Sequence, residues 1–272
     1  MTKPRILLFD SGMGGLTVAS AVAKQLPDAH LIYAADNAGF PYGAWKEDLL
    51  RARIVKVLGA LIERAKPDVV VIACNTASTI AMAALREAYK VPFVGTVPAI
   101  KPAAAQTKSG IIGVLATPGT VNREYTHSLI HTYAFHCKVF LHGAPRLAEI
   151  AEQKLRGHKV DMAELKDEVA PVFRKRDGGR TDVVVLGCTH YPLLTDEIAE
   201  VAPWPVIYID PSPAIARRVA DVAEETPVRV GNDDVPVHGT VILTSARGEA
   251  SETLTAYGTM GFPRHEVLEM GV

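Results

Sequence analysis

The feature that most constrains the fold of this chain is a short segment that occurs twice. Asp68–Cys74 and Asp182–Cys188 share an Asp, three consecutive Val and a final Cys, and the two cysteines stand 114 residues apart. A second pair of segments, Leu8–Ser11 and Val114–Thr117, corresponds in the same order at an offset of 106 residues. Two features that repeat in one order predict two copies of a single structural unit.

Short β-branched runs alternate with longer segments of helical periodicity along most of the sequence. Several runs are apolar at every position, which is typical of strands buried on both faces. We expect strands at Arg5–Phe9, His30–Ala34, Val69–Ala73, Val91–Gly95, Ile111–Ala116, Cys137–Leu141, Val183–Gly187 and Val206–Ile209. Helical spacing of apolar residues occurs in Leu49–Ala65, Thr79–Tyr89, Pro145–Arg156 and Ala214–Glu225. Pro227–Thr244 is expected to be a loop with one late strand. This alternation predicts an α/β protein with parallel sheets and helices on both faces.

Composition excludes several classes of protein. The 272 residues carry a formal net charge of −1, which argues against nucleic acid or an anionic membrane as the main partner. With 48% hydrophobic residues the chain is too apolar for disorder, yet no apolar stretch approaches the roughly 18 residues of a membrane span. The apolar run Ile6–Phe9 is too short for a signal peptide, and three cysteines do not form a disulfide framework. These features predict a cytoplasmic protein.

Two of the three cysteines occur in a context that suggests chemistry. Cys74 and Cys188 each follow a predicted strand, at the edge where open α/β sheets bind ligands. Each is followed by short polar residues and by a segment expected to be helical, so that a helix N-terminus would favour the thiolate. Cys137 lacks this context, and we expect it to serve only in packing.

Three kinds of chemistry use a pair of thiols. A metal site would need further ligands at close spacing and a disulfide relay would need neighbouring thiols, and the sequence offers neither pattern. The third kind is proton transfer from opposite sides of one carbon atom, which inverts a stereocentre and suits two similar lobes. The glycine-rich Ser11–Leu16 lacks the spacing of a nucleotide loop and is better interpreted as a tight turn whose backbone amides approach a small carboxylate.

Five motifs in order resemble the glutamate racemase family, the cofactor-independent branch of the aspartate/glutamate racemase superfamily. They are Asp10–Gly12, Pro41–Gly43, Ala73–Ser78, Ala116–Thr120 and Leu186–Leu194. The resemblance covers residues 5–219. It implies two α/β lobes with the active site in the cleft between them, no cofactor, no metal, L- and D-glutamate as substrates, and a supply of D-glutamate for peptidoglycan.

The resemblance also implies roles for particular residues. Cys74 and Cys188 would be the catalytic thiols, with Asp10 assisting the first, and His190 and Glu152 assisting the second. The substrate would be held by Asp10, Ser11, Tyr42, Gly43, Asn75, Thr76, Thr117, Thr189 and His190. The lobes would comprise residues 1–97 with 212–272, and residues 98–211, and the protein would be a homodimer.

The chain departs from the family pattern in three places. Ala144-Pro145 stands where many members have Cys-Pro, so that Glu149 competes with Glu152 for the assisting role. Residues 37–40 carry no arginine, although the family often has one there, and Asp210–Ser212 differs from the usual Asp-Ser-Gly. An aspartate or hydantoin racemase, a non-catalytic amino-acid-binding protein and a nucleotide-binding module remain as alternatives.

Overall fold

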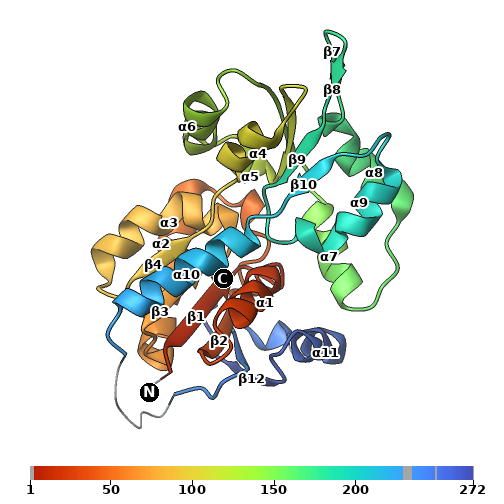
Figure 1. Ribbon diagram of the computed structural model, residues 1–272. Helices are drawn as coiled ribbons and strands as arrows, with labels where there is room; N and C mark the ends of the chain where they lie inside the picture. Colours follow the sequence, from red (N-terminus) through yellow and green to blue (C-terminus); the bar gives the residue numbers. More distant parts are fainter. Residues whose placement is uncertain (1–2, 229–234, 249, 272) are drawn as a thin grey trace. The chain divides into compact units, whose positions relative to one another are not determined.

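The computed structural model describes residues 3–228, 235–248 and 250–271. Its Cα packing divides the chain into two compact units, which we call unit 1 (Met1–Thr96 with Ser212–Val272) and unit 2 (Val97–Pro211). The two segments of unit 1 are the red-to-yellow and the blue parts of the chain in Figure 1. Among the described residues, no helix is both long enough and apolar enough to cross a membrane.

Unit 1 is built on a parallel sheet with the strand order β12-β11-β2-β1-β3-β4. Its first segment contains β1 (Arg5–Asp10), α1 (Leu16–Gln25), β2 (His30–Ala35), the 3-10 helix η1 (Tyr42–Ala44), α2 (Glu47–Ala65), β3 (Val69–Ile72), α3 (Asn75–Ala88) and β4 (Phe93–Gly95). Its second segment contains α10 (Ser212–Glu225), β11 (Thr240–Leu243), η4 (Ala246–Gly248), α11 (Ser251–Thr259) and β12 (Arg264–Val267).

Helices cover both faces of the unit 1 sheet. Alternate strand residues such as Phe9 and Ile72 pack with α2 and α3 in one buried cluster. On the other face α1 and α10 pack side by side against the strands, as Figure 1 shows. Every residue of β3 is buried, as expected for a central strand covered on both faces.

Unit 2 is built on a second parallel sheet, with the order β10-β9-β5-β6. Its helices are α4 (Ile100–Gln106), α5 (Pro118–Val121), α6 (Glu124–Tyr133), α7 (Leu147–Leu155), α8 (Met162–Val169), η2 (Ala170–Val172), η3 (Tyr191–Leu194) and α9 (Thr195–Val201). Its strands are β5 (Ile111–Ala116), β6 (Lys138–Gly143), β9 (Val183–Leu186), β10 (Ile207–Ile209) and the antiparallel hairpin β7 (Lys175–Arg176) and β8 (Gly179–Arg180). One sheet face packs on α7, α8 and α9, and the other on α4 and α6.

The two sheets repeat one arrangement down to the register of their central strands. The order β2-β1-β3-β4 corresponds to β6-β5-β9-β10. Phe9 pairs with Ile72 in the first sheet, and Leu115 pairs with Leu186 in the second, which are the sequence offsets of 106 and 114 residues. The predicted repeat and the α/β class with two parallel sheets are therefore confirmed.

The structure differs from the expected elements at several points. Cys137 precedes β6, which begins at Lys138, and its side chain packs beside the α4–α6 cluster. The late strand expected in Pro227–Thr244 is β11, while residues 229–234 of that stretch lie outside the described residues. Strand β12 was not expected, because its residues Arg264, His265 and Glu266 are polar, as is common at a sheet edge.

Candidate functional site

In unit 1 the candidate residues follow β1 and β3, the adjacent central strands. The helices that follow these strands, α1 and α3, cover opposite faces of the sheet, and such a switch point is where open α/β sheets bind ligands. Asp10 ends β1 and Cys74 stands two residues beyond β3, held there by the hydrogen bond from Ala73 N to Phe9 O (2.8 Å). The strand register thus brings these two residues to one edge of the sheet.

Ser11 links Asp10 to Cys74. Its hydroxyl donates to Asp10 Oδ1 at 3.2 Å and lies 3.9 Å from Cys74 Sγ. All three side chains are buried, so the carboxylate and the thiol interact with little screening by water. Gly12 N also donates to Asp10 Oδ1 (3.0 Å), so this backbone amide, which the sequence suggested for a ligand carboxylate, binds the chain's own carboxylate.

The glycine-rich turn after β1 is packed tightly. Tyr33 donates its hydroxyl to Gly12 O at 2.8 Å. A Cβ atom at Gly15 would lie 2.8 Å from that hydroxyl oxygen and 2.9 Å from Cβ of both Asp10 and Ala73. The glycine is therefore needed for close approach of backbone and side chains, and it keeps Asp10 beside the strand that leads to Cys74.

Cys74 is the N-cap residue of α3, and the residues after it form the first turn of that helix. Asn75 and Thr76 are buried there. Within the part of the chain that the structure describes, neither the amide nitrogen nor the amide oxygen of Asn75 has a hydrogen-bond partner. An unsatisfied buried amide costs about 1–3 kcal/mol, so a ligand that binds it recovers that free energy.

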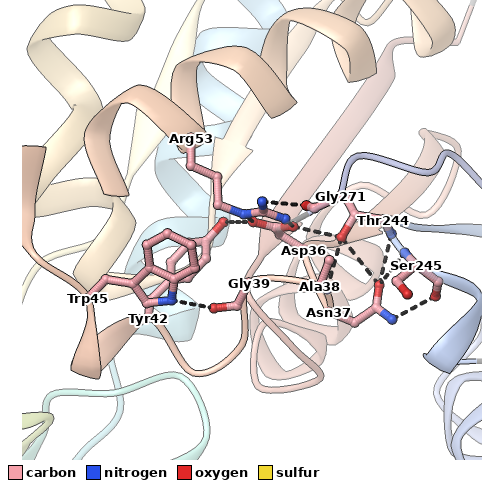
Figure 2. Close-up of polar contacts among 10 residues, drawn as sticks. All are labelled: Asp36, Asn37, Ala38, Gly39, Tyr42, Trp45, Arg53, Thr244, Ser245 and Gly271. Carbon is pink, nitrogen blue, oxygen red and sulfur yellow. Dashed lines mark hydrogen bonds and ion pairs between the residues drawn. The ribbon is translucent and has the colours of Figure 1, made fainter. Parts of the chain in front are cut away.

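The predicted binding residues Tyr42 and Gly43 lie in η1, and Tyr42 shares a buried cluster with Cys74. Figure 2 shows that the Tyr42 hydroxyl donates to Asp36 Oδ2. Burial, followed by the charge of Asp36, raises the pKa of Tyr42 well above its usual value. Tyr42 is therefore a neutral phenol at any physiological pH.

In unit 2 the second cysteine heads a chain of polar contacts. Cys188 Sγ lies 3.7 Å from His190 Nδ1, and His190 Nε2 lies 3.1 Å from Glu152 Oε1. Arg156, the C-cap residue of α7, donates to Glu152 Oε2 at 2.6 Å. The cysteine, histidine and glutamate side chains are all buried. Together they form a continuous series of polar contacts from the thiol to Arg156.

The charge of His190 depends on these contacts. Burial lowers the pKa of the imidazole, but hydrogen bonds to Cys188 and Glu152 and the charges of these groups outweigh it, so the pKa is raised well above its usual value. The raised pKa favours the protonated imidazole, which lies within reach of the Cys188 sulfur.

The remaining predicted residues are distributed as follows. Glu152, not Glu149, contacts His190, while Glu149 is half exposed and pairs with Arg146. Thr117 follows β5 and caps α5 by accepting from Thr120 N (3.2 Å). Thr189 is buried between Cys188 and His190.

One expectation about Cys188 is wrong. The residue does not stand at the N-terminus of an α-helix, because a turn and the four-residue 3-10 helix η3, with Pro192 in its first turn, separate it from α9. The helix dipole therefore acts on Cys74 but not on Cys188, where the nearby cation is His190.

Sequence reasoning missed two arginines. Arg53 donates two hydrogen bonds to the Asp36 carboxylate, and Arg156 donates one to the Glu152 carboxylate. Arg53 lies in an amphipathic helix and Arg156 directly follows one, and in both places the sequence pattern is that of a solvent-exposed arginine. Among the described residues, no three His, Cys, Asp or Glu side chains gather as metal ligands would.

Comparisons with known proteins agree with this geometry. A sequence model of the Asp/Glu/hydantoin racemase family matches residues 16–219. Glutamate racemase from Brucella anthropi is 51% identical over 243 residues, covering 89% of this chain and 86% of that protein. Glutamate racemase from Brucella abortus is 52% identical over 230 residues, covering 84% and 82%.

Solved structures are similar over nearly the whole chain. The crystal structure of Escherichia coli glutamate racemase with L-glutamate and the activator UDP-MurNAc-Ala has a TM-score of 0.90 and 41% identity, covering 98% of this chain and 99% of that one. A glutamate racemase isoform from Bacillus anthracis has a TM-score of 0.80 and 28% identity, covering 99% and 98%. The resemblance inferred from the five motifs is confirmed.

Proposed function

The chain belongs to the Asp/Glu/hydantoin racemase family, and we propose that it interconverts L- and D-glutamate by proton transfer at Cα between Cys74 and Cys188. The reaction class follows from the family. The choice of glutamate is supported by the relatives at 51–52% identity and by the structural neighbour crystallised with L-glutamate.

One observation carries the proposal. Cys74 and Cys188 occupy the same position in two repeats of one fold, each two residues beyond the central strand and beside its switch point. Packing alone gives no reason for buried thiols at both equivalent edges. Two-base racemisation does, because it needs two similar acid–base groups that act on opposite faces of one carbon atom.

The reaction balances with the two thiols alone. One cysteine, as thiolate, removes the Cα proton and becomes a thiol, and the electron pair remains on the substrate. The other cysteine, as thiol, delivers its proton to the opposite face and becomes a thiolate. The reverse reaction uses the same groups in exchanged roles, so one cysteine acts on L-glutamate and the other on D-glutamate. The mechanism requires units 1 and 2 to act as two lobes that present their thiols to opposite faces of one substrate.

The neighbours of each thiol assist it differently. The imidazolium of His190, oriented by Glu152, stabilises negative charge on Cys188 during proton transfer. Asp10 accepts a hydrogen bond from Ser11, whose hydroxyl also lies beside Cys74, so the serine can turn between the carboxylate and the thiol as the proton moves.

Substrate binding is assigned to the polar groups at the two sheet edges. Asn75 supports this assignment most directly, since its buried amide is unsatisfied within the described residues. The rest of the set is Asp10, Ser11, Thr76, Thr117, Thr189, His190 and the turn at Tyr42 and Gly43. By resemblance, the protein would act as a cytoplasmic homodimer that supplies D-glutamate for peptidoglycan.

The test is racemisation of L-glutamate by purified protein in D₂O without added cofactor or metal. Chiral chromatography should show D-glutamate, and mass spectrometry should show deuterium at its Cα. Cys74→Ser and Cys188→Ser should each lower kcat by about 10³-fold or more, whereas Cys137→Ser serves as the control with turnover near that of the wild type. The two-thiol mechanism would be refuted by product without deuterium, or by normal turnover in Cys74→Ser or Cys188→Ser. The assignment to glutamate would be refuted if aspartate or hydantoins were the preferred substrates.

A further inference from the structure

A buried ion pair between Asp36 and Arg53 holds the turn that contains Tyr42 and Gly43. No sequence motif predicts this ion pair. Asp36, the first residue after β2, is fully buried. Arg53 on α2 binds it with two parallel hydrogen bonds, from Nε to Oδ2 at 2.7 Å and from the terminal nitrogen to Oδ1 at 2.6 Å. A two-pronged arginine–carboxylate contact fixes both distance and orientation, which a single charge contact does not.

Asp36 transmits this constraint to the turn. Its carboxylate accepts hydrogen bonds from the Tyr42 hydroxyl and from Thr244 Oγ1, the latter at 2.6 Å (Figure 2). Its backbone oxygen accepts from Gly39 N at 2.9 Å. The carboxylate thus joins α2, the turn and the segment after β11 at one buried point, and Tyr42 has its ring in the same cluster as Cys74.

Arg53 itself is held on two further sides. It donates to Gly271 O at 2.6 Å, and its guanidinium lies 5.7 Å from the centre of the Trp45 ring. Trp45 in turn donates from Nε1 to Gly39 O at 2.9 Å. The guanidinium is therefore enclosed by residues from both ends of the turn and cannot swing away without breaking several contacts.

Gly39 leaves the space that the guanidinium fills. A Cβ atom there would lie 2.6 Å from Arg53 Nε, 2.7 Å from Asp36 Oδ2 and 3.0 Å from Tyr42 Cε1. Residues 37–40 carry no arginine of their own, so the cation that neutralises Asp36 comes from α2. A small residue at position 39 and an arginine at position 53 are thus two parts of one arrangement.

We propose that Arg53 is a positioning residue that, through Asp36, holds the Tyr42–Gly43 turn in its substrate-binding geometry beside Cys74. This inference rests on the proposed function, since it assumes that the turn binds substrate. Arg53 does not touch the reacting atoms, and its loss affects chiefly the capture of substrate rather than the proton transfer.

The test compares Arg53→Gln and Gly39→Ala with Arg64→Gln. Arg64 is a matched control, because it also lies on α2, eleven residues beyond Arg53, and forms an ion pair with Glu266 in the C-terminal part of the chain at 2.8 Å. Arg53→Gln should raise KM for glutamate about tenfold with kcat within about threefold, and Gly39→Ala should do the same by displacing the guanidinium. Arg53→Lys should recover only part of the loss, since it restores the charge but not the two-pronged contact.

Hydrogen–deuterium exchange of the free protein separates this inference from the proposed function. Amides of residues 38–45 should exchange about tenfold faster or more in Arg53→Gln than in Arg64→Gln. Equal exchange in the two variants, or a KM equal to that of the wild type, would overturn the positioning role. A wild-type protein without racemase activity would instead refute the proposed function, while the exchange comparison would still decide whether Arg53 holds the turn.

Discussion

The two cysteine environments occupy equivalent places in the repeat and differ in chemistry. At Cys74 the polar neighbours are a hydroxyl and a carboxylate, from Ser11 and Asp10, and the cysteine is the N-cap residue of a fourteen-residue helix. At Cys188 the neighbour is an imidazole whose own partner is a buried carboxylate. The comparison teaches that the repeated backbone fixes where a thiol stands, while separate side chains give each thiol different polar surroundings.

The largest effect should come from removing one thiol and leaving the other. With Cys74→Ser, Cys188 can still exchange the Cα hydrogen of the enantiomer whose proton faces it, and Cys188→Ser should retain exchange with the opposite enantiomer. Each variant should thus incorporate solvent deuterium into one enantiomer at least about 10³-fold faster than into the other, without inversion. Proton NMR of L- and D-glutamate incubated separately in D₂O measures this.

The same enantiomer preference in both variants would contradict the proposal that the thiols face opposite sides of the substrate. The Cys137→Ser variant, which should exchange and invert both enantiomers, is the control for this experiment.

A smaller effect should follow from removing the first polar neighbour of each thiol. His190→Asn deletes the group that can carry a positive charge and should lower kcat about 10²–10³-fold, within the range of general acid–base contributions. Ser11→Ala deletes a neutral hydroxyl and should lower kcat less than about tenfold. Steady-state kinetics of the two variants measures the difference, and equal losses would show that the charge on His190 has no special role.

The smallest effect concerns stability as a function of pH. Because the pKa of His190 is raised above its unfolded value of about 6.5, its ion pairing contributes fully to the free energy of unfolding below that pH. The contribution is lost as the pH rises through the folded-state pKa. Denaturant unfolding from pH 6 to pH 10 should therefore show a decline for the wild type that His190→Asn lacks. Parallel curves for the two proteins would show that His190 is not charged in the fold.

Much of the fold could be predicted because the buried strands are apolar at every position. The repeated Val runs predicted β3 and β9 and their correspondence in two copies of one structural unit. The hairpin β7–β8 and strand β12 could not be predicted, because two-residue strands and polar edge strands lack a periodic pattern.

The candidate site could be predicted where a motif marks the residue itself, and not where a partner is chosen by packing. Glu149 and Glu152 lie one turn apart on α7, and only burial distinguishes the exposed one from the one that reaches His190. Arg53 is separated by 17 residues from Asp36, and nothing in the helical pattern of α2 shows that this arginine points inward.

The order of strands in unit 1 has a consequence for biosynthesis. The chain leaves unit 1 after β4, passes through all of unit 2, and returns to add β11 against β2. Unit 1 continues from Thr96 only at Ser212, so more than a hundred further residues are synthesised in between. Until β11 is synthesised, the edge of β2 that it pairs with remains unpaired. An unpaired parallel edge invites wrong pairing. During translation, then, unit 2 can mature first, and Thr244, which binds Asp36, arrives only after it.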